Sequence, residues 1–132
     1  MPTYDELTKA IKSKSLAPAY LLAGEEPLYI DRLAQLLLDT LIPEEERDFN
    51  LSVLYGAEVG ARDILTEAMR FPMMGARVLV VVREAQLIKD LDLLAEHLET
   101  LPSSTCLVLC YKKKPDKRKS LYKTLQADDA VY

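Results

Sequence analysis

A run of five aliphatic residues, Val78 to Val82, constrains the fold of this chain more than any other feature. No polar residue alternates with them, which is typical of a strand buried on both faces, as in the middle of a parallel sheet. Such a strand needs helices on both sides, so the run predicts an α/β protein. We therefore expect Val78–Val82 to lie inside a parallel sheet, with a neighbouring strand on either side.

Three further segments have the composition of strands, and helical patterns separate them. The predicted strands are 19–23, 49–55 and 106–110, and the predicted helices are about 4–12, 27–41, 61–69, 87–101 and 120–126. This alternation predicts a three-layer α/β sandwich with a mostly parallel sheet of about five strands. Residues 130–132 only begin the fifth strand. We therefore expect residues 1–132 to be a single N-terminal domain, truncated from a longer multi-domain protein.

The composition excludes several classes of protein. No apolar run approaches the roughly 18 residues that a membrane helix needs, and the N-terminus lacks the basic-then-apolar order of a signal peptide. We therefore expect a cytoplasmic protein without a membrane partner. On one strand, Cys106 and Cys110 would stand roughly 13 Å apart, too far for a disulfide. With His97 as the single histidine, no metal site is expected.

The turn after the first predicted strand lies where nucleotide-binding proteins of this class hold phosphate. It begins at Gly24, which matches the first glycine of the phosphate-loop pattern G-x-x-x-x-G-K-[ST]. Tyr29 replaces the second glycine, Ile30 the lysine, and Asp31 the hydroxyl residue that supports the metal. Glutamates 25–26 stand where triphosphate charge would sit, so the electrostatics oppose ATP.

The second nucleotide motif fails as well. In the Walker B pattern, an aliphatic strand is followed by an acid that supports magnesium. Here Arg83 takes that position and Glu84 follows it. Two losses at matched positions predict the frame of a P-loop NTPase with a degenerate nucleotide site and no cofactor. We expect no intrinsic catalysis, and an active P-loop NTPase is the least favoured alternative.

A short connection before Val78 holds an unusual group of apolar residues. Phe71, Met73 and Met74 are crowded around Pro72 and Gly75. Proline and glycine favour a turn, and apolar residues are not the default on loops. Two interpretations stay open. The segment folds back onto the core, or it docks into an apolar pocket of a partner.

A second segment is distinguished by its charge. The chain carries a formal charge of −4, yet residues 112–123 hold seven lysines and arginines against the single Asp116. Such a basic loop is commonly a solvated face, and it can also contact phosphate or an acidic partner. The candidate contacts are Lys112, Lys113, Lys114, Lys117, Arg118 and Lys119. A nucleic-acid-binding module with salt-dependent affinity is therefore the main alternative function.

Three segments together resemble the delta subunit of the bacterial DNA polymerase III clamp loader. Residues 18–30 are similar to that family's opening strand and turn, with its G-[DE]-E-P motif. Residues 71–82 are similar to its loop of bulky apolar residues, followed by a basic residue and an aliphatic strand. Residues 115–123 are similar to its D-K-R-x-x-L-x-K segment. The three segments span nearly the whole chain in the same order and spacing.

This resemblance implies a nucleotide-free, AAA+-like first domain within the DNA polymerase III holoenzyme. In the family, this domain binds the ring-shaped sliding clamp (the beta subunit) and helps to open it for loading onto DNA. Two bulky apolar residues enter a hydrophobic pocket of the clamp, and the matching pair is Met73 and Met74, where the family often has Leu-Phe-like residues. Phe71 is an additional contact or a core anchor. The other implied partners are the remaining clamp-loader subunits, reached through later domains, and DNA.

Overall fold

The computed structural model describes the whole chain, Met1–Tyr132, and contains one parallel sheet in the order β1-β4-β3-β2. Its strands are β1 (Ala19–Ala23), β2 (Leu51–Tyr55), β3 (Val78–Arg83) and β4 (Thr105–Tyr111). β3 pairs with β2 on one side and with β4 on the other, both in parallel. All five residues of Val78–Val82 are buried. The prediction of an internal parallel strand is therefore confirmed.

The sheet continues beyond β1 through a single bridge instead of a complete fifth strand. Val131 pairs in parallel with Leu21. The Leu21 N–H donates to the Ala130 carbonyl and the Tyr132 N–H donates to the Leu21 carbonyl, both at 2.9 Å. Four of the five predicted strands are thus complete, and residues 130–132 add the first bridge of the fifth at the β1 edge.

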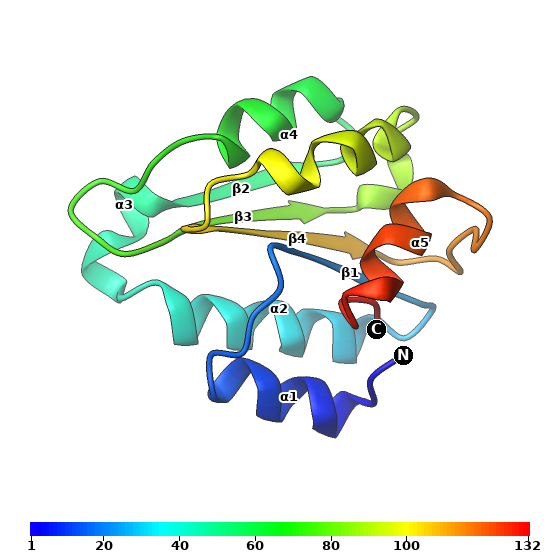
Figure 1. Ribbon diagram of the computed structural model, residues 1–132, viewed down its shortest axis with the longest axis horizontal. Helices are drawn as coiled ribbons and strands as arrows, with labels where there is room; N and C mark the ends of the chain where they lie inside the picture. Colours follow the sequence, from blue (N-terminus) through cyan, green and yellow to red (C-terminus); the bar gives the residue numbers. More distant parts are fainter.

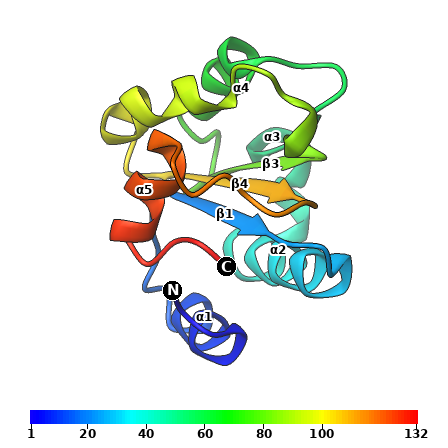
Figure 2. The same ribbon diagram turned by 90° about the vertical axis from the view of Figure 1, so that its right-hand side faces the viewer.

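Helices cover both faces of the sheet, which confirms the three-layer α/β sandwich (Figure 1). On one face, α2 (Pro27–Leu41) packs on the sheet and α1 (Tyr4–Lys12) packs against α2. On the other face lie α4 (Ala61–Ala68) and the 3₁₀ segment η3 (Leu91–Thr100). α5 (Ser120–Ala127) packs against η3 and β1. The layers are separate in the turned view of Figure 2, where the two termini lie near each other.

The structure corrects two predicted boundaries. Residues 49–50 are not part of β2, because they end the short helix α3 (Arg47–Asn50), which follows the 3₁₀ turn η1 (Glu44–Glu46). The predicted helix over 87–101 begins later, at Leu91, and is the 3₁₀ segment η3; only Leu87 of that range lies in the preceding 3₁₀ turn, η2 (Ala85–Leu87). No helix of the chain combines the length and the apolar character that crossing a bilayer requires.

Two tertiary hydrogen bonds tie the start of η3 to its neighbours. The Asp90 carboxylate accepts a hydrogen bond from the Ala61 N–H at 3.0 Å, at the start of α4. The Asp92 carboxylate accepts one from the Leu121 N–H at 2.8 Å, at the start of α5. Both bonds satisfy backbone donors that a helix N-terminus leaves free. They connect η3 to the two helices that share its face of the sheet.

Candidate protein-docking site

The loop between α4 and β3, residues 71–77, is named the apical loop here, and it carries the two most exposed large apolar side chains of the protein. Met74 is 89% exposed, Phe71 is 74% exposed and Met73 is 55% exposed. The loop protrudes at the end of the sheet where β3 begins (Figure 1). The interpretation that these side chains fold back onto the core is therefore wrong. The alternative, that they form a docking surface, fits the geometry.

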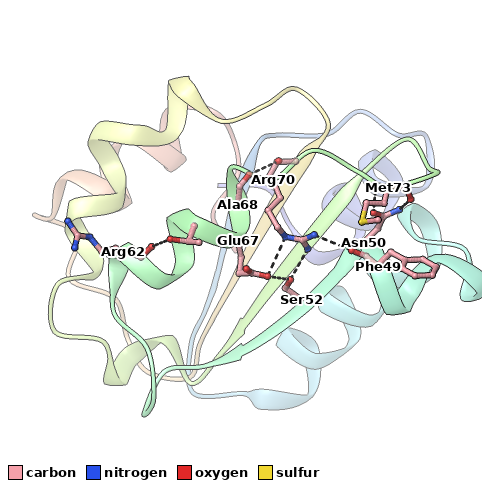
Figure 3. A network of polar contacts seen from close by, with 10 residues as sticks. Phe49, Asn50, Ser52, Arg62, Glu67, Ala68, Arg70 and Met73 are labelled. Carbon is pink, nitrogen blue, oxygen red and sulfur yellow. Dashed lines mark hydrogen bonds and ion pairs between the residues drawn. The ribbon is translucent and has the colours of Figure 1, made fainter.

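Arg70, just before the apical loop, ties the end of α4 to the neighbouring strand (Figure 3). Its guanidinium donates to the Phe49 carbonyl at 3.3 Å and to Ser52 Oγ at 3.1 Å. Arg70 Nε also lies 3.4 Å from Glu67 Oε1, and Ser52 Oγ donates to that same oxygen at 2.6 Å. This network fixes the point at which the chain leaves α4 and enters the loop.

Two residues of this site were not predicted from the sequence. Asn50 is fully buried, and its side chain bonds the backbone of Met73 in the apical loop. Phe49, its neighbour in α3, is 43% exposed and adds an aromatic side chain close to the loop. A local indication existed, because a buried asparagine between Phe49 and Leu51 must find hydrogen-bond partners. That reasoning indicates a tether, although it does not identify its partner.

The degenerate nucleotide site lies at the opposite end of the sheet, at the carboxyl ends of the strands. Gly24 has φ +137°, a conformation that L side chains rarely adopt. Its N–H donates to the carbonyls of Tyr111 and Lys113, both at 3.1 Å, so this amide is already committed. Ile30, in the position of the phosphate-loop lysine, is fully buried in the core. The Gly24 amide and the Ile30 side chain therefore offer no free donor or cation to a phosphate.

Asp31, Arg83 and Lys112 form an ion cluster at this end of the sheet. Lys112 Nζ lies 3.1 Å from Asp31 Oδ1, and Arg83 Nη1 lies 3.9 Å from the same oxygen. The Asp31 carboxylate on α2 thus neutralises cations from the ends of β3 and β4, which would otherwise be available to a phosphate. Tyr29, in the position of the second glycine, packs edge-on against Tyr4 with ring centroids 5.2 Å apart.

The polar groups next to the position of the Walker B acid are hydrogen-bonded to one another. Glu84, after Arg83, has a left-handed backbone with φ +54° and accepts a hydrogen bond from the Gln86 amide. Gln86 Oε1 accepts in turn from the Lys112 N–H at 3.0 Å. No three His, Cys, Asp or Glu side chains in the chain lie in a group that could hold a metal ion.

The basic loop is partly neutralised by carboxylates of the same chain. Besides the Lys112 pair, Lys114 Nζ lies 3.7 Å from Glu25 Oε1. Arg118 donates two side-chain hydrogen bonds to Asp116, both at 3.0 Å, and these bonds hold the pKa of that carboxyl at about 2. The three predicted contacts without a carboxylate within 4.0 Å are Lys113, Lys117 and Lys119, and all three are exposed.

The fold defines the class of this chain as a three-layer α/β domain with a parallel sheet, in which Ile30 and Arg83 hold the positions of the phosphate-loop lysine and the Walker B acid. Residues 20–132 match the family model described as "DNA polymerase III, delta subunit". The chain therefore belongs to the delta subunit family of the DNA polymerase III clamp loader, which acts in DNA replication. This confirms the resemblance noted in the sequence.

Known relatives agree with this family. The DNA polymerase III subunit delta of Bacillus subtilis is 27% identical in an alignment of 132 positions. The alignment covers 92% of this chain and 38% of the relative. The solved structure of the Bacillus subtilis DNA clamp loader delta protein (YqeN) matches with a TM-score of 0.83 and 26% identity. The match covers 98% of this chain and 41% of the YqeN chain. The chain thus spans about two fifths of the length of these relatives.

A more distant structure shares the fold alone. It is a DNA polymerase III gamma subunit-related protein of Thermotoga maritima, with a TM-score of 0.62 and 19% identity. The match covers 99% of this chain and 44% of that protein. The α/β architecture of this chain therefore also occurs in that protein.

Proposed function

We propose that this protein docks on the sliding clamp through its apical loop and helps to open the ring for loading onto DNA. The observation that carries the proposal is the exposure of Phe71, Met73 and Met74 on one loop. The delta family assignment and the similarity to a protein titled a clamp loader delta protein support it. The proposed partner is the beta subunit of the same replication system.

The chemistry of the apical loop suits an apolar pocket. Exposed apolar groups that lie together on a soluble domain mark interaction sites. Methionine is flexible and polarizable, so Met73 and Met74 can fill an irregular cavity. Phe71 supplies a rigid aromatic group of the kind that anchors interfaces. The sheet and α4 hold the two ends of this loop, so the apolar side chains are presented from a folded base.

We also propose that the chain contributes no ATP hydrolysis. The ion cluster of Asp31, Arg83 and Lys112 and the buried Ile30 support this, since neither arrangement leaves a cradle for phosphate. Nucleotide hydrolysis then belongs to other clamp-loader subunits. We assign contacts with these subunits to later domains, because the relatives are more than twice as long as this stretch. A replication role places the protein in the cytoplasm.

The basic loop supports a second, subsidiary contact. Lys113, Lys117 and Lys119 are exposed and have no acidic partner nearby, so they are available to DNA phosphates or to an acidic protein surface. The loop has few aromatic side chains on which bases could stack. We therefore propose a secondary contact, separate from the clamp contact, whose affinity depends strongly on salt.

A calorimetric titration of the protein with the sliding clamp of the same organism tests the main proposal. We expect saturable binding that does not change when ATP and magnesium are added. Changing the six basic residues of 112–119 to alanine should leave clamp affinity nearly intact and remove affinity for DNA. A clamp titration without measurable heat at micromolar concentrations, confirmed by an optical binding assay, would overturn the proposal.

A further inference from the structure

We infer that Asn50 is a positioning residue that holds the apical loop in its docking conformation, an inference that rests on the proposed clamp contact. Asn50 is the last residue of α3 and is fully buried. It is one of only two buried residues that are polar. A buried amide requires hydrogen-bond partners, and those of Asn50 identify its role.

The apical loop makes no backbone–backbone hydrogen bond over residues 71–77. Before it, the Arg70 N–H donates to the Glu67 carbonyl at 3.3 Å. After it, the Val78 N–H donates to the Ser104 carbonyl at 3.0 Å. A loop fixed only at its ends samples many conformations, and ordering it costs conformational entropy. A contact in the middle of the loop is therefore needed to hold Met73 in one place.

Asn50 provides that contact, as Figure 3 shows. Its Oδ1 accepts from the Met73 N–H at 2.8 Å, and its Nδ2 donates to the Met73 carbonyl at 2.9 Å. Nδ2 also donates to Glu46 Oε1 at 3.2 Å, so both amide hydrogens are used. Reversing the amide would set donor against donor and acceptor against acceptor at Met73, so these partners specify its orientation.

The two bonds to Met73 also determine the geometry of the residues that follow. Met74 has φ +59°, a left-handed conformation that is uncommon outside glycine and persists only when its surroundings hold it. A Cβ atom at Gly75 would lie 1.9 Å from Glu46 Oε1 and 2.8 Å from Asn50 Nδ2. Glycine therefore lets the backbone approach the Asn50 amide closely. The tether and the glycine together turn Met74 outward.

The expected effect on affinity follows from the population of the docking conformation. When only a fraction of the molecules is competent to bind, the apparent dissociation constant rises by the inverse of that fraction. If the untethered loop is competent about a tenth of the time, Asn50→Ala should weaken clamp binding about tenfold. The side chains that contact the clamp would be unchanged.

The test combines amide hydrogen exchange with clamp affinity in the purified protein. In Asn50→Ala, the Met73 amide loses its acceptor, so it should exchange as fast as an unstructured amide, and affinity should fall about tenfold. Thr66→Ala is the control, because the Thr66 hydroxyl donates to the Arg62 carbonyl within α4 and belongs neither to the Asn50 tether nor to the Arg70 network. It should change neither measurement at the loop.

A double-mutant cycle separates positioning from a general structural role. In a protein that already carries Met73→Ala and Met74→Ala, Asn50→Ala should change clamp affinity less than twofold, because the two side chains that Asn50 positions are already truncated. Equal losses in both backgrounds would overturn the inference. If Met73→Ala and Met74→Ala leave affinity unchanged, the proposed function fails, while the exchange rate still reports whether the tether exists.

A second variant covers the case in which Asn50→Ala does not fold. Gly75→Ala places a methyl group against Glu46 and Asn50 from an exposed position. It should speed exchange of the Met73 amide and weaken clamp binding with little effect on the core. A Gly75→Ala protein with wild-type exchange and wild-type affinity would contradict the inference, as would an Asn50→Ala protein with a fast-exchanging Met73 amide and undiminished affinity.

Discussion

Replacing Met73 and Met74 together by alanine should weaken clamp binding by on the order of a hundredfold. Met74 is 89% exposed and Met73 is 55% exposed in the free protein, so most of one side chain and half of the other remain to be buried. Complete burial of a methionine side chain contributes about 1.5–3 kcal/mol. Scaled by the exposed fractions, the pair contributes about 2–4 kcal/mol, and about 1.4 kcal/mol corresponds to tenfold in affinity.

The same exposures predict that the fold survives this double substitution. Only the buried half of Met73 and a small part of Met74 support the free protein, so we expect a loss of about 0.8–1.7 kcal/mol in the free energy of unfolding. Truncation of a methionine packed in the core would instead lower the free energy of unfolding by about 2–5 kcal/mol. Urea unfolding and calorimetric titration of one preparation give both quantities.

Leu93→Ala provides the matched control. Leu93 is 53% exposed, close to the value for Met73, but it lies on η3, away from the apical loop. It should change neither stability nor clamp affinity appreciably. The reasoning is refuted by a folded double-alanine protein that binds as tightly as wild type. It is equally refuted if Leu93→Ala weakens binding as much as the double substitution does.

Three further predictions concern the core and the charged surfaces. Ile30→Lys restores the phosphate-loop lysine but buries an unpaired charge. The free energy of unfolding, measured in urea, should therefore fall by about 3–5 kcal/mol. Calorimetry should detect no ATP binding to this variant. Burial raises the pKa of the Cys106 thiol to about 12 and of the Cys110 thiol to about 11. Because the thiolate is the reactive form, iodoacetamide at about pH 8 should label neither cysteine until the protein unfolds. DNA affinity in an electrophoretic shift assay should fall steeply with salt and disappear when the basic residues of 112–119 become alanine; affinity that persists would place the DNA contact elsewhere.

The sequence predicted β1, β3 and β4 well because these strands are buried on both faces. Unbroken apolar runs such as Ala19–Ala23 and Val78–Val82 have few alternatives to a buried parallel strand. The η3 segment shows the limit of this reasoning. Leu91 and Leu94, three residues apart, are both buried, but that spacing suits a 3₁₀ turn as well as an α-helix. Periodicity predicted which side chains are buried and not which backbone hydrogen bonds form.

The candidate site was predicted in part, and the part that was missed depends on contacts between distant residues. An apolar loop bounded by proline and glycine can be recognised locally, so Phe71, Met73 and Met74 were found. The bond between Asn50 and Met73 joins residues 23 apart, and the Asp31–Lys112 pair joins residues 81 apart. No local pattern encodes such pairs, because the folded sheet brings them together.

Site-specific photocrosslinking tests the central claim most directly, because it reports which surface the apical loop touches. A photoreactive methionine analogue placed only at position 74 should crosslink to the sliding clamp, with the modified clamp peptide lining an apolar pocket. The same kind of group at position 93 should give no crosslink. Equal crosslinking from the two positions, or none from position 74 under conditions where the clamp is bound, would contradict the claim that this loop docks on the clamp.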